Sequence, residues 1–410
     1  MLAPEFFPTW GGAGTYILGL LAHLPERFEF TVLTTRRRSF GPALRPGGNH
    51  CDDSPILPGN LRRGIKISYI SQARDTVFYN GQFQCACSRE VPRLLKSEEI
   101  DLIHSHSAHM PDLLLRFRNV KIPIVTTVHN IFQTMREATK ASGLEFGLLE
   151  RSEKFTLAMY PVLRAVENAY FSRGTEYIAP SYWMKSRLER GLCKRSAIAV
   201  IPNSVDPGDY SEVGRSLPNH TNQLLDHRRI VLYCGRLLAA KGVDILIRAI
   251  PGIIKATRDP RLLFVFAGPA SPVPYVKKLE SLNISRESYL FAGPLIREEV
   301  ISLMKMAEVL VVPSFLENCP FTVLEGMASG TAVVASNVGG IPEIITDGFD
   351  GMLVKPGCPG ELSNLVARLL GDASLRLHLG QNAKETIAER FSWSANVSQY
   401  ISLYEGQLRR

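Results

Sequence analysis

The sequence places two cations, Arg236 and Lys241, five residues apart in the glycine-bounded segment 235–242. An apolar run that predicts a strand precedes this segment directly. When they lie on one loop, a guanidinium group and an ammonium group can together bind a diphosphate. The segment therefore indicates a phosphate-binding loop, and a solvated helix start is the alternative when the segment is taken alone.

Two carboxylates stand eight residues apart at Glu317 and Glu325, with Pro320 between them. Proline fits the first turn of a helix because it lacks an N–H that would go unpaired there. The amides of Phe321 and Thr322 would then face an anion at the positive end of that helix. The two carboxylates could reach different parts of one ligand, although such a pair is also common on plain surface.

A glycine-rich segment at 11–14 precedes an amphipathic stretch that predicts a helix over 15–24. Amides without side chains can approach a phosphate at the positive end of a helix, so Gly12 is a candidate for donor binding. The spacing differs from the GxGxxG of dinucleotide-binding folds. A tight turn explains these glycines equally well.

Histidines follow two of the strands predicted in the first half of the chain. His106 comes after the run 102–104, and His129 with Asn130 comes after the run 122–128. Because the carboxyl ends of parallel strands meet at one edge of a sheet, both imidazoles are expected to top adjacent strands. For a single histidine in such a place, a structural role is the alternative.

All of these segments lie at the ends of β-branched runs that alternate with helical patterns, which predicts parallel sheets covered by helices. At 410 residues the chain exceeds what one core usually organises, so two domains are expected, divided in the polar stretch 203–228. A strand before Pro4 can only be short. The other expected strands are 28–34, 65–70, 102–104, 122–128, 177–179, 198–201, 230–234, 262–267, 289–292, 309–312, 332–335 and 352–354.

Together these segments resemble the retaining glycosyltransferases of family 4. The resemblance runs from residues 8–12 to 391–393, and its most specific part is the E-x7-E pair with its flanks at 313–314, 326–330 and 338–343. Residues 201–206 are similar to the family's inter-domain N-G-V-D segment, with Ser204 in place of the glycine.

The fold that the resemblance implies is α/β: GT-B, two doubly wound Rossmann-like domains facing each other across a cleft. Residues 1–205 would form the acceptor-side domain and residues 206–393 the nucleotide-sugar-binding domain. A C-terminal helix over about 394–410 would pack back onto the first domain.

The resemblance also assigns roles to the candidate residues of the donor end. Arg236 and Lys241 would neutralise the donor diphosphate, helped by Gly12 and by the amides of Phe321 and Thr322.

The remaining roles concern the two sugars. Glu325 would accept hydrogen bonds from the ribose hydroxyls, and Glu317 would hold hydroxyls of the donor sugar. His129 would contact that sugar at the reacting face, and His106 and Asn130 would lie on the acceptor side.

The implied activity is retaining transfer of a hexose from a UDP- or GDP-linked sugar to a glycan, lipid-linked or small-molecule acceptor. Fixed cations can stabilise the leaving diphosphate, where other transferases use a divalent ion held by Asp-x-Asp. No such motif follows a predicted strand, and Asp52 and Asp53 lie in a long loop at 40–64, so neither metal nor cofactor is expected. A GT-B-fold sugar-nucleotide epimerase and a non-catalytic nucleotide-sugar-binding subunit are the alternatives.

The net charge of +8 and the pI of about 9.1 favour anionic partners, and the absence of nucleic-acid motifs argues against nucleic acid. Seven dispersed cysteines predict free thiols, and no signal peptide or membrane span is evident, so a cytoplasmic protein is expected. Basic residues around the long loop predict peripheral contact with an anionic inner membrane face, with a solvated surface as the alternative. They are Arg36, Arg37, Arg38, Arg45, Arg62, Arg63 and Lys66.

Overall fold

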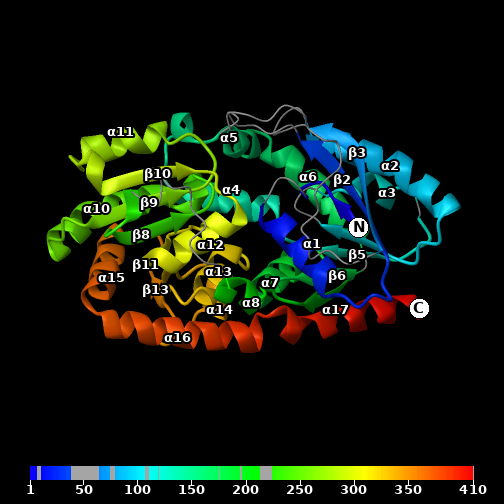
Figure 1. Cartoon of the computed structure of the whole chain (residues 1–410). Helices are drawn as coiled ribbons and strands as arrows, with labels where there is room; N and C mark the ends of the chain where they lie inside the picture. The colour runs from blue at the N-terminus through cyan, green and yellow to red at the C-terminus, as the bar shows by residue number, and fades with distance from the viewer. Residues whose placement is uncertain are drawn as a thin grey trace, which may run out of the picture.

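The computed structural model describes residues 1–6, 11–37, 64–73, 79–106, 110–118, 120–174, 176–193, 196–212 and 224–409. Within these ranges the chain forms two parallel sheets, each covered by helices, which lie side by side in Figure 1. Nearly all of the expected loop 40–64, with most of its arginines, lies outside the described residues. Contacts are described for the side chains of two of the basic residues: Lys66 pairs with Glu98 at 3.2 Å, and the guanidinium of Arg36 lies 5.2 Å from the ring centroid of Tyr69.

The first sheet has the strand order β3-β2-β1-β4-β5-β6-β7, and its paired strands run parallel. Its first strand is two residues long, as expected for a strand placed before Pro4. The strands are β1 (Leu2–Ala3), β2 (Phe30–Arg37), β3 (Ile65–Ala73), β4 (Ile103–His106), β5 (Ile124–Thr127), β6 (Glu176–Ala179) and β7 (Ala197–Val200).

The second sheet has the order β10-β9-β8-β11-β12-β13 and is also parallel. All six residues of β9 are buried, which is typical of a strand covered on both faces. The strands are β8 (Arg229–Cys234), β9 (Leu262–Ala267), β10 (Tyr289–Gly293), β11 (Ala307–Val312), β12 (Ala332–Ser336) and β13 (Met352–Val354). The predicted α/β architecture of two doubly wound sheets is confirmed.

Helices connect the successive strands of both halves, apart from β2 and β3, whose connection lies outside the described residues. Around the first sheet lie α1 (Gly12–His23), α2 (Tyr79–Ser97), α3 (Leu113–Arg116), α4 (Phe132–Ala141), the 3-10 turn η1 (Phe146–Leu148), α5 (Arg151–Ala158), α6 (Tyr160–Phe171) and α7 (Tyr182–Gly191). Around the second lie α8 (Pro207–Glu212), η2 (Ala239–Lys241), α10 (Val243–Thr257), α11 (Val273–Ser281), η3 (Arg286–Ser288), α12 (Arg297–Met306), α13 (Phe321–Ala328), α14 (Ile341–Ile344), α15 (Pro359–Gly371) and α16 (Ala373–Arg390).

The last helix, α17 (Trp393–Leu408), returns to the first half of the chain and packs against α1. In Figure 1 it continues the line of α16 and runs beneath the first sheet. Trp393, Tyr400 and Tyr404 join the core of that half. The chain passes from one half to the other near Val205 and returns near Phe391. These two crossings lie side by side, since Val205 N donates to Phe391 O and Trp393 N donates to Val205 O.

Candidate active site at the domain junction

The loop after β8 is shaped so that Lys241 meets the loop after β11. Gly242 has φ 69°, and a Cβ added there would lie 1.9 Å from the carbonyl oxygen of Pro313. Only glycine permits this approach. Lys241 Nζ donates to Glu317 Oε1 at 2.6 Å, so the predicted cation and the predicted carboxylate form an ion pair. Arg236 lies exposed at the start of the same loop.

The loop that carries Glu317 is fixed by contacts on several sides. Ser314 Oγ donates to the same Glu317 oxygen at 2.8 Å, and Gly340 N donates to the Glu317 carbonyl at 3.0 Å. At Gly339, whose φ is 58°, a Cβ would lie 1.7 Å from that carbonyl oxygen. Glu317 is 8% exposed and therefore projects from a preformed loop rather than from a mobile surface.

Helix α13 begins at Phe321, so Pro320 is its N-cap and not a residue of its first turn as predicted. The correction is small, because the first amides of the helix still lack acceptors within it. The Phe321 ring packs against the cores of both domains. A Cβ on Gly12 would lie 3.5 Å from this ring, so Gly12 and Phe321 meet across the junction. Helix α1 begins at Gly12, three residues earlier than the predicted start at 15.

Glu325 lies apart from Glu317 and has its own partners. Burial raises the pKa of its carboxyl, and Arg297 and Tyr210 act against this shift. Arg297 Nη1 lies 3.5 Å from Glu325 Oε1, and Arg297 Nη2 lies 2.8 Å from Asp209 Oδ2. Arg297, which was not predicted from the sequence, thus ties Glu325 on α13 to α8 and α12.

On the first domain, His129 follows β5 as predicted, whereas His106 is the last residue of β4 and does not follow it. The strand is longer than predicted because His106 pairs with Thr127 in the sheet. The two imidazoles stack at 5.6 Å, and His106 Nδ1 lies 3.4 Å from His129 Nε2. The rings of Tyr16 and His129 meet edge to face, with their centroids 4.9 Å apart.

His106 is only 1% exposed and lies next to His104 in the same strand. Burial holds the pKa of His106 well below its usual range and lowers that of His104 to about 3. Both imidazoles are therefore neutral. This position indicates that His106 supports His129, and its acceptor-side role stays a prediction.

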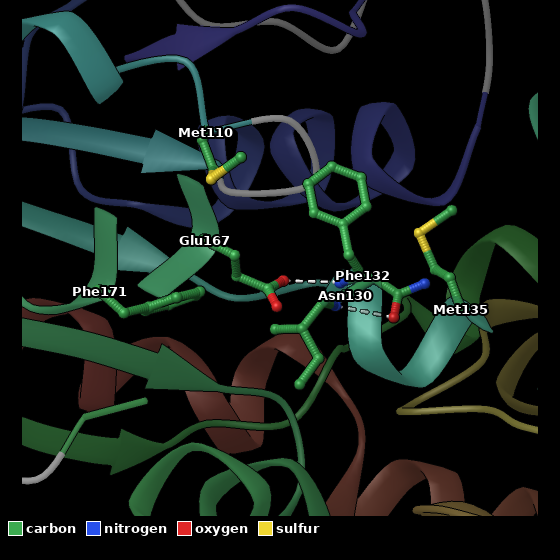
Figure 2. Close-up of a pocket in the computed structure, with 7 residues that line it drawn as sticks. Met110, Asn130, Phe132, Met135, Glu167 and Phe171 are labelled. Carbon is green, nitrogen blue, oxygen red and sulfur yellow. Dashed lines mark hydrogen bonds between the residues drawn. The ribbon is translucent and has the colours of Figure 1, made fainter. Parts of the chain in front are cut away.

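Asn130 holds the start of α4. Its Oδ1 accepts hydrogen bonds from Ile131 N at 2.9 Å and from Thr134 Oγ1 at 2.6 Å. Glu167 Oε1 accepts from Phe132 N at 2.6 Å, as Figure 2 shows, and Arg164 donates to its other oxygen. Burial raises the pKa of Glu167. The hollow in Figure 2 is lined by Met110, Asn130, Ile131, Phe132, Met135, Glu167 and Phe171.

Contacts between the domains were not predicted from the sequence. Asn318, inside the E-x7-E segment, donates to the carbonyl oxygens of Val128 and His129. The carboxylate of Glu343 accepts from Tyr182 N at 2.7 Å and from Trp183 N at 2.6 Å. Asn318 and Glu343 both lie in the motif segments that carry the family resemblance. Their place in those segments is the sequence feature that could have identified them, since their residue types alone do not indicate a contact between domains.

The junction therefore gathers Lys241 and Glu317 from one domain beside the His129 strand end of the other. Within the described residues, no three His, Cys, Asp or Glu side chains gather as a metal-binding group. None of the helices in the described ranges is long and apolar enough to span a bilayer. The six cysteines in those ranges are free thiols.

Family models match both halves of the chain. The model described as Glycosyltransferase Family 4 matches residues 10–209, and the model described as Glycosyl transferases group 1 matches residues 219–386. The uncharacterized glycosyltransferase MJ1178 of Methanocaldococcus jannaschii is 30% identical over 327 residues, which are 76% of this chain and 77% of that protein. The chain belongs to glycosyltransferase family 4.

Other curated relatives match only part of this chain. A D-inositol 3-phosphate glycosyltransferase of Corynebacterium glutamicum is 33% identical over 183 residues, which are 43% of this chain and 43% of that protein. The chain thus spans about half the length of the first curated relatives it matches.

Solved structures of low identity share the whole fold. WaaG, a glycosyltransferase of lipopolysaccharide biosynthesis, has a TM-score of 0.69 at 16% identity and 99% coverage of both chains. Anabaena Alr3699/HepE, in complex with UDP and glucose, has a TM-score of 0.68 at 19% identity and 98% coverage of both chains. The predicted GT-B fold is confirmed.

Proposed function

We propose that this protein is a retaining, metal-independent glycosyltransferase that moves a hexose from a nucleotide-diphosphate sugar to a glycan, lipid-linked or small-molecule acceptor. The observation that carries the proposal is the ion pair between Lys241 and Glu317, 2.6 Å long, at the junction where His129 follows the end of β5. The structural neighbour Alr3699/HepE was solved in complex with UDP and glucose, which supports a UDP-linked sugar as the first donor to test.

In this proposal the donor diphosphate lies by the loop after β8 and the first amides of α13. Breaking the bond between the anomeric carbon and the phosphate oxygen leaves the electron pair on that oxygen. Lys241, the exposed Arg236 and the amides of Phe321 and Thr322 would stabilise this charge as it develops. Glu317 would orient Lys241 and accept hydrogen bonds from sugar hydroxyls, and Glu325 would accept from the ribose.

The acceptor would enter from the first domain. Its hydroxyl oxygen would attack the anomeric carbon on the face from which the diphosphate departs, and its proton would pass to the leaving phosphate oxygen. His129 would contact the sugar at this face, held by its contacts with Tyr16 and His106. No protein nucleophile is needed in this scheme, and the anomeric configuration is retained.

Incubating the protein with UDP- and GDP-linked hexoses tests the proposal. The expected result is release of free nucleoside diphosphate with an acceptor present, undiminished in excess EDTA, and a product whose anomeric configuration by NMR equals that of the donor. Activity lost to EDTA and restored by magnesium or manganese would overturn metal independence. An epimerised nucleotide-sugar, or nucleotide binding without turnover, would overturn the transferase assignment in favour of an epimerase or a binding subunit.

A further inference from the structure

A carboxylate of the first domain reaches the loop of the second domain that carries Lys241. Glu153 lies on α5 and is only 7% exposed. Its Oε1 accepts a hydrogen bond from Ala240 N at 3.1 Å, and its Oε2 lies 3.5 Å from Ala239 N. Both amides belong to η2, the turn that ends in Lys241.

The same turn is held on its other side by the loop that carries Glu317. Phe315 N donates to Ala240 O at 2.9 Å, and Gly242 lies against Pro313 O. Helix α4, which begins three residues after His129, also packs against η2 and against α5. The turn is therefore clamped between the His129 side of the first domain and the Glu317 side of the second.

A hydrogen bond to a carboxylate is stronger than one between neutral groups, and removing a buried acceptor leaves the amides unpaired. Because Glu153 and η2 belong to different domains, this contact forms only when the domains come together. A carboxylate here would repel a diphosphate, and both of its oxygens face amides of η2, so we assign it no contact with the donor. A negatively charged acceptor is suited to the N–H groups of the turn and unsuited to an anionic ligand.

We propose that Glu153 is a positioning residue that couples the placement of Lys241 to domain closure. In the open protein, η2 lacks its acceptor from α5 and Lys241 has freedom relative to His129. In the closed protein, Glu153 fixes the turn and thereby the ammonium group beside the diphosphate. This inference rests on the proposed transferase function.

Glu153 also has a local role, which supplies a matched control. Its Oε2 accepts from Glu150 N at 3.1 Å, and the Glu150 side chain caps the amide of Glu153 in return. Glu150→Ala breaks this capping box from the other side without removing the acceptor of η2. Glu153→Gln keeps an acceptor and suits a capping box but lacks the charge.

The experiment compares the wild-type protein with E153A, E153Q and E150A, using UDP as the binding probe and the best UDP-sugar as donor. E153A is expected to lower kcat about 10- to 100-fold, from the loss of a charged hydrogen bond. The Kd for UDP should change less than kcat does, because Arg236 and the amides of Phe321 and Thr322 lie in the second domain and have no contact with Glu153 in the described part of the chain. E153Q should fall between, and E150A should lower Tm but leave kcat unchanged.

Small-angle scattering of the nucleotide-free proteins gives a second readout, in which E153A is expected to show a larger radius of gyration than wild type. A wild-type protein that neither binds UDP nor turns over sugar would overturn the proposed function itself. An active wild type with an equally active E153A, or with an E150A that loses as much kcat, would overturn the positioning role alone. If E153A fails to fold, E153Q decides in the same way.

Discussion

The side-chain amide of Asn318 joins the loop that carries Glu317 to the backbone of His129. Its Nδ2 lies 3.3 Å from the carbonyl oxygens of both His129 and Val128. Ser181 Oγ donates to its Oδ1, so the same side chain also holds the start of α7. One residue of the second domain therefore sets the position of Glu317 relative to His129 of the first.

Asn318→Ala should lower kcat about 10- to 100-fold, because buried hydrogen bonds worth about 1–3 kcal/mol hold the two halves of the site together. Asn382 is a matched control, since it is equally buried at 8% and donates to Phe349 O at 2.8 Å within the second domain. Asn382→Ala should cost similar stability in urea unfolding without the loss in kcat. Equal kcat for the two variants would contradict the bridging role.

Lys241 and Glu317 should act as a unit. Each of Lys241→Met and Glu317→Gln is expected to lower kcat about 100- to 1000-fold, as for removal of a preorganised electrostatic group. The double variant should lose less than the product of the two, because the single variants remove the same contact. Lys278→Met, which breaks a 3.0 Å pair with Asp244 between α11 and α10, serves as the control and should keep its activity. Losses in single-turnover kinetics that are additive in free energy would show that Lys241 and Glu317 act independently and would contradict their acting as a pair.

The buried histidines should make stability fall in mild acid. Burial lowers the pKa of His104 to about 3 and holds that of His106 well below its usual range, so both stay neutral in the folded protein while they become protonated in the unfolded chain. Stability is then fully present above the unfolded value near 6.5 and is lost as the pH falls below it. Each group contributes a slope of about 1.4 kcal/mol per pH unit in that window.

His106→Asn should therefore flatten the fall in the free energy of unfolding between about pH 6.5 and 4 by one such slope. Urea titrations at a series of pH values measure this. A variant whose stability falls in parallel with that of the wild-type protein would contradict the assignment of His106 as a buried neutral group.

Local pattern was enough to predict the strands and the residues at their ends. Each of the twelve runs predicted as strands corresponds to a strand of the structure, because β-branched runs between turn residues leave few other conformations. The errors concern the ends of elements. Helix α1 begins at Gly12 although glycine disfavours a helix, and β4 extends to His106, because tertiary packing outweighs local propensity at both places.

Contacts between the domains could not be predicted in this way. The bond from Asn318 to Val128 joins residues 190 positions apart, and that from Glu153 to Ala240 joins residues 87 apart. Nothing in a single sequence encodes such a distance. The chemistry of Lys241 and Glu317 could be inferred from their types, whereas the residues that position them became visible only once the two sheets were placed together.

The return of α17 to the first domain depends on one glycine, which gives a last prediction. A Cβ on Gly19 of α1 would lie 2.4 Å from three atoms of the Trp393 indole. Trp393 is 3% exposed and stacks on His23 at 5.5 Å, so it has no room to withdraw. Gly19→Ala should lower the free energy of unfolding by about 1–3 kcal/mol through overpacking, although alanine favours a helix. Gly406→Ala, in α17 itself with open space around it, should raise that energy by up to about 1 kcal/mol. Chemical denaturation of both variants measures the two changes, and a gain in both would mean that α17 does not pack on α1 in this way.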